Sequence, residues 1–173
     1  MAWLTATEVG LKTPKGQALF SGVSFSISAG DCALIEGANG SGKTTLLKTL
    51  AGFRKPDHGQ IKLNLPLRRV HYLPQVGNSR FFMPMTLLDI IGRSRRDDAL
   101  QLGLMRENDL QRSWNTASGG ERQRTLITRA LLSSSDLLIL DEPLNHLDAH
   151  VRITVLERLK DVVDQGQQAL ILV

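Results

Sequence analysis

Residues that could bind phosphate stand together in the segment 37-GANGSGKTT-45. The segment fits the pattern G-x-x-x-x-G-K-[ST], in which the N–H groups of a glycine-rich loop surround phosphate oxygens. Lys43 would supply a positive charge to the β- and γ-phosphates, and the Thr44 hydroxyl is a ligand for Mg²⁺. The alternative is a flexible turn, which the preceding apolar strand and the following helical pattern disfavour. The segment predicts a nucleotide site formed by Gly37, Ala38, Asn39, Gly40, Ser41, Gly42, Lys43, Thr44 and Thr45.

Two adjacent carboxylates end the apolar segment 137-LLILDE-142. They are expected to emerge at the carboxyl end of a strand, where parallel α/β sheets bind ligands. Asp141 is placed to hold Mg²⁺, and Glu142 is placed to accept a proton from an attacking water. Acids that only cap the following loop are the alternative, but the phosphate loop in the same chain favours the catalytic interpretation.

A second group of small residues lies in 117-ASGGERQR-124. Ser118, Gly119 and Gly120 offer a hydroxyl and uncovered N–H groups at the start of a helix, where anions bind. Ser118 and Glu121 also fit the capping box S-x-x-E. The two interpretations are compatible, because a capped helix terminus still attracts anions. Gln75 closes an apolar strand and opens a helical region, so it could link the nucleotide to a moving subdomain; a solvated loop residue is the alternative.

The elements that must position these groups alternate between strands and helices. Alternating apolar residues predict a half-buried strand over 18–27, and the continuous apolar run at 32–37 predicts a buried parallel strand. A helix from about residue 119 is expected to face the core with Leu126, Ile127, Ala130 and Leu131. This order predicts a parallel α/β sheet covered on both faces. The remaining predicted elements are strands at 60–63, 69–74, 136–140 and 168–173, helical pieces at 86–92, 97–103 and 106–112, and helices starting near 43 and 149.

Composition limits the class of protein. The chain has 173 residues, 42% of them hydrophobic, which is enough for one domain with its own core. A formal charge of +4, with scattered basic residues, does not indicate a nucleic-acid partner. Cys32 is the single cysteine, so the sequence predicts a reducing compartment and a buried, inert thiol. With neither a signal pattern nor a long apolar run, we expect a soluble cytosolic protein that reaches a membrane only through a partner.

Five segments in order resemble the nucleotide-binding domain of ABC ATPases over nearly the whole chain: 37-GANGSGKTT-45, Gln75, 118-SGGE-121, 137-LLILDE-142 and 143-PLNHLD-148. The resemblance implies a P-loop NTPase fold with a RecA-like parallel sheet, an N-terminal antiparallel β subdomain, an inserted helical subdomain and a truncated C-terminal end. It places the nucleotide-binding core in 1–75 and 119–173, and the helical subdomain in 76–118.

The resemblance also implies how the residues would act. Two domains of this family pack head to tail around two ATP molecules, so Ser118 to Glu121 would contact the γ-phosphate held by the opposite subunit. Asp148 would lie in the loop that crosses the dimer seam, and Gln75 would sense Mg²⁺ and face a membrane subunit. Catalytic roles would belong to Glu142, Gln75 and Lys43, and metal binding to Thr44, Gln75 and Asp141. The implied partners are ATP, Mg²⁺, a second copy of the domain and a membrane permease, at the cytoplasmic face of the membrane.

Departures from the family pattern qualify these expectations. The aromatic residue that usually stacks on adenine is missing near Pro14, unless Phe20 or Trp3 replaces it. Asn145 and His146 stand where small residues are common. The family's switch histidine follows a strand that resembles 169–173, and none of the four histidines matches it. The resemblance therefore predicts impaired hydrolysis, in a truncated chain or in a natural fragment that binds ATP without turning it over.

The kind of ABC protein is less sharply indicated. The cluster of Phe81, Phe82, Met83 and Met85 lies where transporter subunits dock a membrane partner, although ordinary core packing is an equal alternative. The short helical insertion resembles uptake cassettes of the zinc or manganese type. A soluble ABC ATPase without a transport role, such as one for cluster assembly, is the second hypothesis. A P-loop kinase or GTPase is disfavoured by 118-SGGE-121.

Overall fold

The structure is a computed structural model that describes residues 1–76 and 82–173. The chain forms two compact units. The first contains Met1–Tyr72, Ser135–Asp141 and Val163–Val173, and the second contains Leu73–Ser134 and Glu142–Val162. The partition predicted from the sequence, with a helical subdomain at 76–118, stays a prediction.

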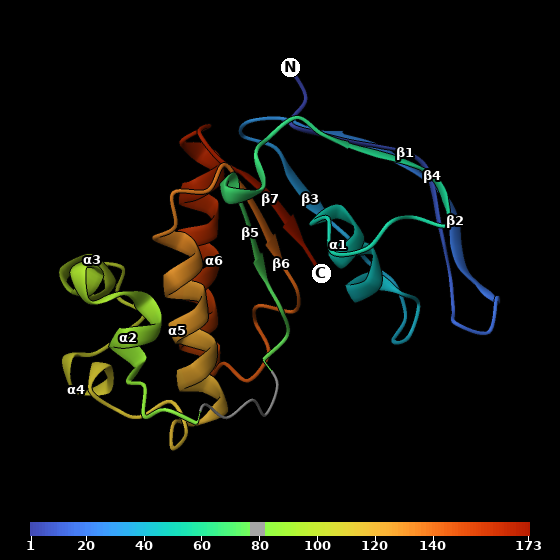
Figure 1. Ribbon diagram of the computed structural model, residues 1–173. Coiled ribbons are helices and arrows are strands. Elements are labelled where there is room, and N and C mark those ends of the chain that lie inside the picture. The colour runs from blue at the N-terminus through green and yellow to red at the C-terminus, as the bar shows by residue number, and fades with distance from the viewer. Residues whose placement is uncertain (77–81) are drawn as a thin grey trace. The chain divides into compact units, whose positions relative to one another are not determined.

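An antiparallel three-stranded sheet opens the first unit (Figure 1). Its strand order is β2-β1-β4. Its strands are β1 (Leu4–Lys12), β2 (Ala18–Ile27) and β4 (His58–Leu63). The β1–β4 register shifts between Thr7 and Gly10, and Glu8 has a positive φ of 51°. At this irregularity Gly59 of β4 lies very close to the backbone of β1. A Cβ added to Gly59 would be 2.3 Å from the carbonyl oxygens of Thr7 and Glu8. The predicted antiparallel subdomain is confirmed, and β1 is a strand that the sequence patterns did not locate.

The second sheet of this unit has the order β3-β7-β6-β5. Its strands are β3 (Cys32–Leu34), β5 (Val70–Leu73), β6 (Leu137–Leu140) and β7 (Ala169–Leu172). Strand β7 pairs in parallel with both β3 and β6, and every residue of β6 is buried. These pairings confirm the predicted α/β fold with a parallel core sheet. The strands of such a sheet are continuously apolar because both of its faces are covered.

Helix α1 (Lys43–Leu50) packs between the elements of this unit as the sequence predicts. Its buried leucines, Leu46, Leu47 and Leu50, share one hydrophobic cluster with Leu4 of β1 and Ile139 of β6. A helix with one leucine face can join two sheets because its 3.6-residue period gathers those side chains along one stripe. The packing of α1 fixes the position of its first turn, and with it the end of the glycine-rich loop that leads into the helix.

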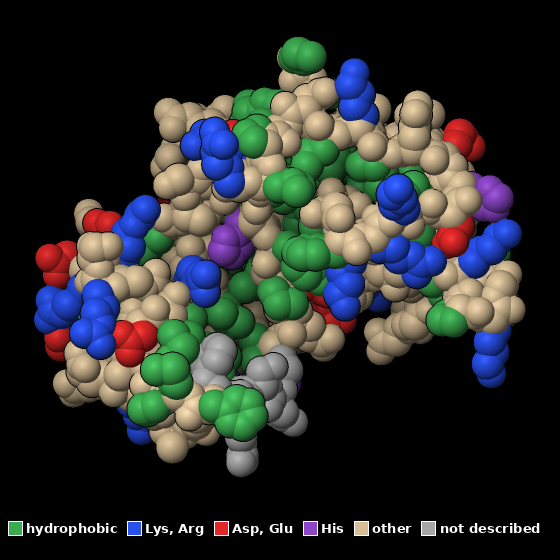
Figure 2. All heavy atoms as spheres, in the orientation of Figure 1, with side chains coloured by type: hydrophobic (Ala, Val, Ile, Leu, Met, Phe, Trp, Pro, Cys, Tyr) green, Lys and Arg blue, Asp and Glu red, His purple; other side chains and the backbone are tan. Residues whose placement is uncertain are grey.

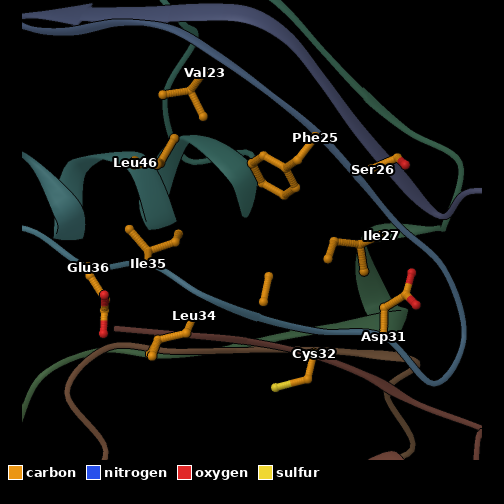
Figure 3. A pocket seen from close by; sticks show the side chains of 11 residues that line it. Val23, Phe25, Ser26, Ile27, Asp31, Cys32, Leu34, Ile35, Glu36 and Leu46 are labelled. Atoms are coloured by element: carbon orange, nitrogen blue, oxygen red, sulfur yellow. The ribbon is translucent and has the colours of Figure 1, made fainter.

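The prediction of a buried strand at 32–37 is wrong, because the strand covers only Cys32–Leu34 and none of residues 32–37 is buried. Strand β3 is at the edge of its sheet, and Cys32 and Leu34 are exposed, the latter by 62%. The sequence pattern could not reveal this, because an apolar run looks the same in a central strand and in an edge strand. Beside β3 lies a groove of about 600 Å³, where Val23, Phe25 and Leu46 face the strand (Figure 3).

The second unit is mainly helical. Its helices are α2 (Leu87–Ile91), α3 (Arg96–Gln101), α4 (Glu107–Leu110), α5 (Gly119–Leu131) and α6 (Ala149–Asp164), the last ending in the first unit. Short 3₁₀ turns occur at Leu67–Arg69 in the first unit and at Arg93–Arg95 in the second. The helical pieces expected near 86–92, 97–103 and 106–112 are confirmed. A small core joins them to α5, and it is made of Leu87, Leu88, Ile90, Ile91, Ala99, Met105, Leu110, Trp114 and Ala117.

The buried face of α5 is more polar than its apolar residues predict. Ile127 and Ala130 are buried as expected, whereas Leu126 and Leu131 are only partly covered. Gln123 and Thr125 are buried instead, because each has a partner: Gln123 donates to the Pro143 carbonyl at 2.7 Å, and the Thr125 hydroxyl donates to the Glu121 carbonyl. Such polar burial is invisible to a pattern of apolar residues.

The surface agrees with the mild charge. On the face drawn in Figure 2, Lys and Arg side chains are spread among Asp and Glu side chains rather than gathered in one field. Among the helices of the described residues, none has both the length and the apolar character needed to span a bilayer.

Candidate nucleotide site

The glycine-rich loop leads directly into α1. Gly40 and Gly42 have φ values of 81° and 97°, and Gly42 is the residue that caps the helix. This left-handed conformation is open to glycine and disfavours other residues, which explains the glycine at the last position before the lysine. The Lys43 ammonium donates to the carbonyls of Gly37 and Ala38, at 2.9 and 3.1 Å. The loop therefore curls around the lysine, with the positive end of α1 behind it.

Two of the three side chains predicted to bind the metal, Thr44 and Asp141, lie together in the first unit. The Thr44 hydroxyl donates to Oδ1 of Asp141 at 3.1 Å, although 97 residues separate them. Oδ2 of the same carboxylate accepts from the Tyr72 hydroxyl at 3.2 Å. Asp141 has no exposed surface, so these two bonds satisfy a carboxylate that would otherwise be buried alone. Burial, followed by the Asp141 charge, raises the pKa of Tyr72 and keeps its hydroxyl a donor.

Glu142 starts the second of the two segments that make up the second unit, and it meets Gln75 there. The Gln75 side-chain amide donates to Oε2 of Glu142 at 2.8 Å, across 67 residues of sequence. Oε2 also accepts from the Asn145 side-chain amide at 2.5 Å. The structure thus brings together the glutamine and the glutamate that the sequence nominates for the reaction. The carbonyl oxygen of Gln75 is the side-chain atom left for a cation, since its amide nitrogen serves the glutamate.

The start of α5 is a complete capping box. The Ser118 hydroxyl accepts from the Glu121 backbone N–H at 3.2 Å, and the Glu121 carboxylate accepts from the Ser118 N–H at 2.7 Å. Arg112 forms an ion pair with Glu121. Burial alone would raise the pKa of Glu121, but the hydrogen bonds from Ser118 and Arg112 outweigh it and hold that pKa below its ordinary value. Glu121 is therefore occupied with the helix start, whereas the Ser118 hydroxyl hydrogen and the N–H groups of Gly119 and Gly120 take no part in the capping box.

The loop after Glu142 lies against this helix start. A Cβ added to Gly119 would lie 3.6 Å from the side chain of His146, and one added to Gly120 would lie 2.9 Å from the His146 carbonyl oxygen. Asp148 accepts from the Val151 N–H at 2.9 Å, which caps α6 and lowers the pKa of Asp148. A cavity of about 510 Å³ opens here and is lined by Arg106, Ser118, Gly120, Arg124, His146, Asp148 and His150, among others.

Sequence reasoning missed two residues of these clusters. Tyr72 stands three positions before Gln75 on a predicted strand, and only the sheet order shows that its hydroxyl meets Asp141. Asn145 departs from the small residues common at its position, and neither its type nor its spacing indicates a role. Trp3 and Phe20 are the two residues that could replace the adenine-stacking aromatic. Trp3 packs against the core of the first unit. The Phe20 ring lies beside the glycine-rich loop, because a Cβ added to Gly42 would be 3.2 Å from it.

Comparison with known proteins agrees with the motifs. The ABC transporter family model matches residues 20–145. The zinc import ATP-binding protein ZnuC of Rhizobium meliloti (strain 1021) is 34% identical over 167 residues, which cover 91% of this chain and 54% of that protein. The aliphatic sulfonates import ATP-binding protein SsuB 3 of Rhodococcus jostii (strain RHA1) is 33% identical and covers 90% of this chain and 59% of its own length. The chain thus spans little more than half the length of these relatives.

Solved structures support the fold. A dimeric ATP-binding cassette in a post-hydrolysis state, bound to ADP and Pi, superposes with a TM-score of 0.82. It is 21% identical, and the match covers 98% of this chain and 87% of that one. The family match over more than half of the sequence, which agrees with the phosphate loop and the Thr44–Asp141 pair, shows that the chain belongs to the ABC transporter family.

Proposed function

We propose that this chain is the ATP-binding subunit of an ABC transporter. In this proposal it binds and hydrolyses Mg-ATP at a head-to-tail dimer interface and powers transport through a separate membrane permease. The observation that carries the proposal is the Thr44–Asp141 hydrogen bond at 3.1 Å, directly beside the lysine loop. This pairing joins the phosphate loop to the strand that ends in two carboxylates.

The donor atoms fit Mg²⁺. A threonine hydroxyl and a buried carboxylate are hard oxygen ligands, which Mg²⁺ prefers over nitrogen or sulfur. Mg²⁺ in this site would neutralise charge on the β- and γ-phosphates. Thr44 and Asp141 would hold the ion, and the Gln75 carbonyl oxygen is our third candidate ligand. Lys43 would turn from the Gly37 and Ala38 carbonyls toward the phosphates, exchanging neutral acceptors for charged ones.

Proton transfer is assigned to Glu142. Its carboxylate is held by Gln75 and Asn145 through one oxygen, which leaves the carboxylate partly accessible for a water. A glutamate in this position can orient a water and accept its proton as the water attacks phosphorus. The other side of the phosphate would face Ser118, Gly119 and Gly120 of a second copy, whose helix start supplies N–H donors.

A membrane partner has a candidate docking surface in the second unit. Phe82 and Met83 are exposed, whereas Met85 packs against the helical core. The expected apolar cluster therefore divides: its described first part faces solvent and its last member is core, while Phe81 lies outside the described residues. Exposed large apolar side chains are typical of protein contacts. We propose that the permease covers Phe82 and Met83, and that this places the chain at the cytoplasmic face of the membrane.

The transported substrate is a further proposal. Two relatives with almost equal identity to this chain are named for zinc import and for aliphatic sulfonate import. The sequence resemblance to uptake cassettes of the zinc or manganese type leads us to propose a metal-ion importer.

The test combines turnover with assembly. The wild-type chain is expected to hydrolyse Mg-ATP, at the impaired rate that the departures from the family pattern predict. Glu142→Gln is expected to lower that rate by about a hundredfold or more, since general base catalysis contributes 10²–10⁴-fold. Size-exclusion chromatography of Glu142→Gln should show a dimer with Mg-ATP and a monomer without it.

Affinity purification should retain a polytopic membrane protein, and Phe82→Ser should weaken that retention. Retention by RNA or by a soluble scaffold, with no membrane protein, would contradict the transport assignment.

A further inference from the structure

The carboxylate of Glu142 receives two side-chain amides on the same oxygen. Gln75 donates to Oε2 at 2.8 Å and Asn145 donates to it at 2.5 Å. The two donors come from different parts of the chain, 67 and three residues away. Neither amide occupies Oε1, so these two bonds leave Oε1 as the oxygen that can accept a proton from a water. A carboxylate fixed through one oxygen presents the other in a defined direction.

The backbone around Glu142 supports the same arrangement. Glu142 and His146 have positive φ values of 49° and 62°, which non-glycine residues rarely adopt. The Asn145 N–H donates to the Glu142 carbonyl at 3.3 Å and closes a turn between them. Strained residues of this kind persist where the surroundings determine them strongly, and they cluster at reactive sites. The turn brings the side chain of Asn145 back to the carboxylate three residues earlier.

The loop that carries Asn145 is anchored on both sides of it. Before Asn145, the buried Gln123 side chain donates to the Pro143 carbonyl at 2.7 Å. After it, the His146 carbonyl lies so close to α5 that a Cβ on Gly120 would approach it to 2.9 Å. These contacts hold the loop against α5 without using the Asn145 side chain. The Asn145 amide is therefore not needed to place the loop, and its bond acts on Glu142.

We infer that Asn145 is a positioning residue for Glu142: its amide, together with that of Gln75, fixes Oε2 and aims Oε1 at the attacking water. The inference rests on the proposed function, in which Glu142 accepts the proton. It assigns a role to a residue that departs from the small residues common at this position. A misplacement of about 1 Å in a reacting group can lower a rate by about a hundredfold, so loss of one of two tethers should be measurable.

The kinetic test uses the 173-residue protein with Asn145→Ala and Asn145→Asp. Both variants are expected to lower kcat for Mg-ATP by about tenfold or more, with KM changed by less than about twofold, because the nucleotide loop is untouched. Asn108→Ala and Asn108→Asp make the same changes on an exposed residue of α4 and should leave kcat unchanged. In a Glu142→Gln background, Asn145→Ala should lower the residual rate no further, since the two residues act as a unit.

A second readout does not need turnover. The side-chain amide signals of Asn145 can be identified in a ¹⁵N–¹H NMR spectrum by their absence in Asn145→Ala. Glu142→Gln replaces a charge-assisted hydrogen bond with a neutral one, so these signals should move upfield, while those of Asn108 stay in place. If the wild-type chain hydrolyses no ATP, the proposed hydrolysis fails, and the NMR result alone decides the inference.

Three results would overturn the inference. The first is a wild-type kcat in both Asn145 variants. The second is an equal fold-loss from Asn145→Ala with and without Glu142→Gln, which indicates a general structural defect. The third is an Asn145 side-chain amide signal whose chemical shift does not change in Glu142→Gln.

Discussion

Thr44 and Asp141 lie 97 residues apart in the chain, and their side-chain oxygens lie 3.1 Å apart in the first unit. The hydroxyl belongs to the first turn of α1, and the carboxylate follows the buried strand β6. This contact joins the phosphate loop to the acidic strand end, so it is the point where a metal would be held and where binding is most simply tested.

Removal of the Thr44 hydroxyl should weaken the magnesium-dependent part of ATP binding. With Thr44→Ala, we expect the affinity for ATP in Mg²⁺ to fall about tenfold, which corresponds to about 1.4 kcal/mol, because one metal ligand is lost. Affinity measured in EDTA should change little. Thr44→Ser keeps the oxygen and should bind like the wild type. Titration of a fluorescent ATP analogue measures all three proteins, and an equal loss with and without Mg²⁺ would refute the metal role.

Gly119 and Gly120 offer a matched pair for the helix start. Alanine normally stabilises a helix by up to about 1 kcal/mol relative to glycine, and Gly119→Ala meets only ordinary contacts, so it should be neutral or stabilising. Gly120→Ala places a methyl group 2.9 Å from the His146 carbonyl and should destabilise by about 1–3 kcal/mol, as overpacking does. Urea denaturation compares the two. Equal stabilities would show that the loop moves away freely.

The capping box of α2 should make stability depend on acid. The Thr86 backbone N–H, and then Arg93, lower the pKa of Asp89 to about 2, from an ordinary value of 3.8. A folded-state pKa below the unfolded one means that this stability is present above about pH 4 and is lost as the pH falls toward 2. Asp89→Asn should therefore lower the melting temperature at pH 7, and its difference from wild type should shrink below pH 4. Asp98→Asn, on an exposed residue, should show no such trend; a pH-independent difference would count against the cap.

Cys32 should react as an exposed but weakly acidic thiol. The side chain lies on edge strand β3, while partial burial raises the pKa of the thiol above its ordinary value of 9.0. A raised pKa leaves less thiolate at neutral pH, so reaction with a disulfide reagent should go to completion in the native protein, but more slowly than for a small free thiol. The rate should still rise above pH 9. If Cys32 reacts only after denaturation, the thiol is buried, as the sequence predicts, and its exposure in the structure is contradicted.

Features that depend on neighbouring residues were readable from the sequence. The loop from Gly37 to Thr45 and the capping box of Ser118 and Glu121 are made by residues within a few positions of each other, so their spacing specifies their geometry. The order of strands and helices follows from apolar periods of two and 3.6 for the same reason. The family and the fold class could therefore be inferred before any coordinates.

Features that depend on distant residues were decided only by the tertiary structure. The meeting of Tyr72 with Asp141, and of Gln75 with Glu142, depends on which strands and loops become neighbours, and periodicity carries no record of that. The exposure of Cys32 depends on the place of β3 at the edge of its sheet. The bond from Asn145 to Glu142 spans only three residues, yet it requires a left-handed turn that Gln123 and Gly120 help to hold. Sequence by itself determined which groups could act; the packing of remote segments determined which of them meet.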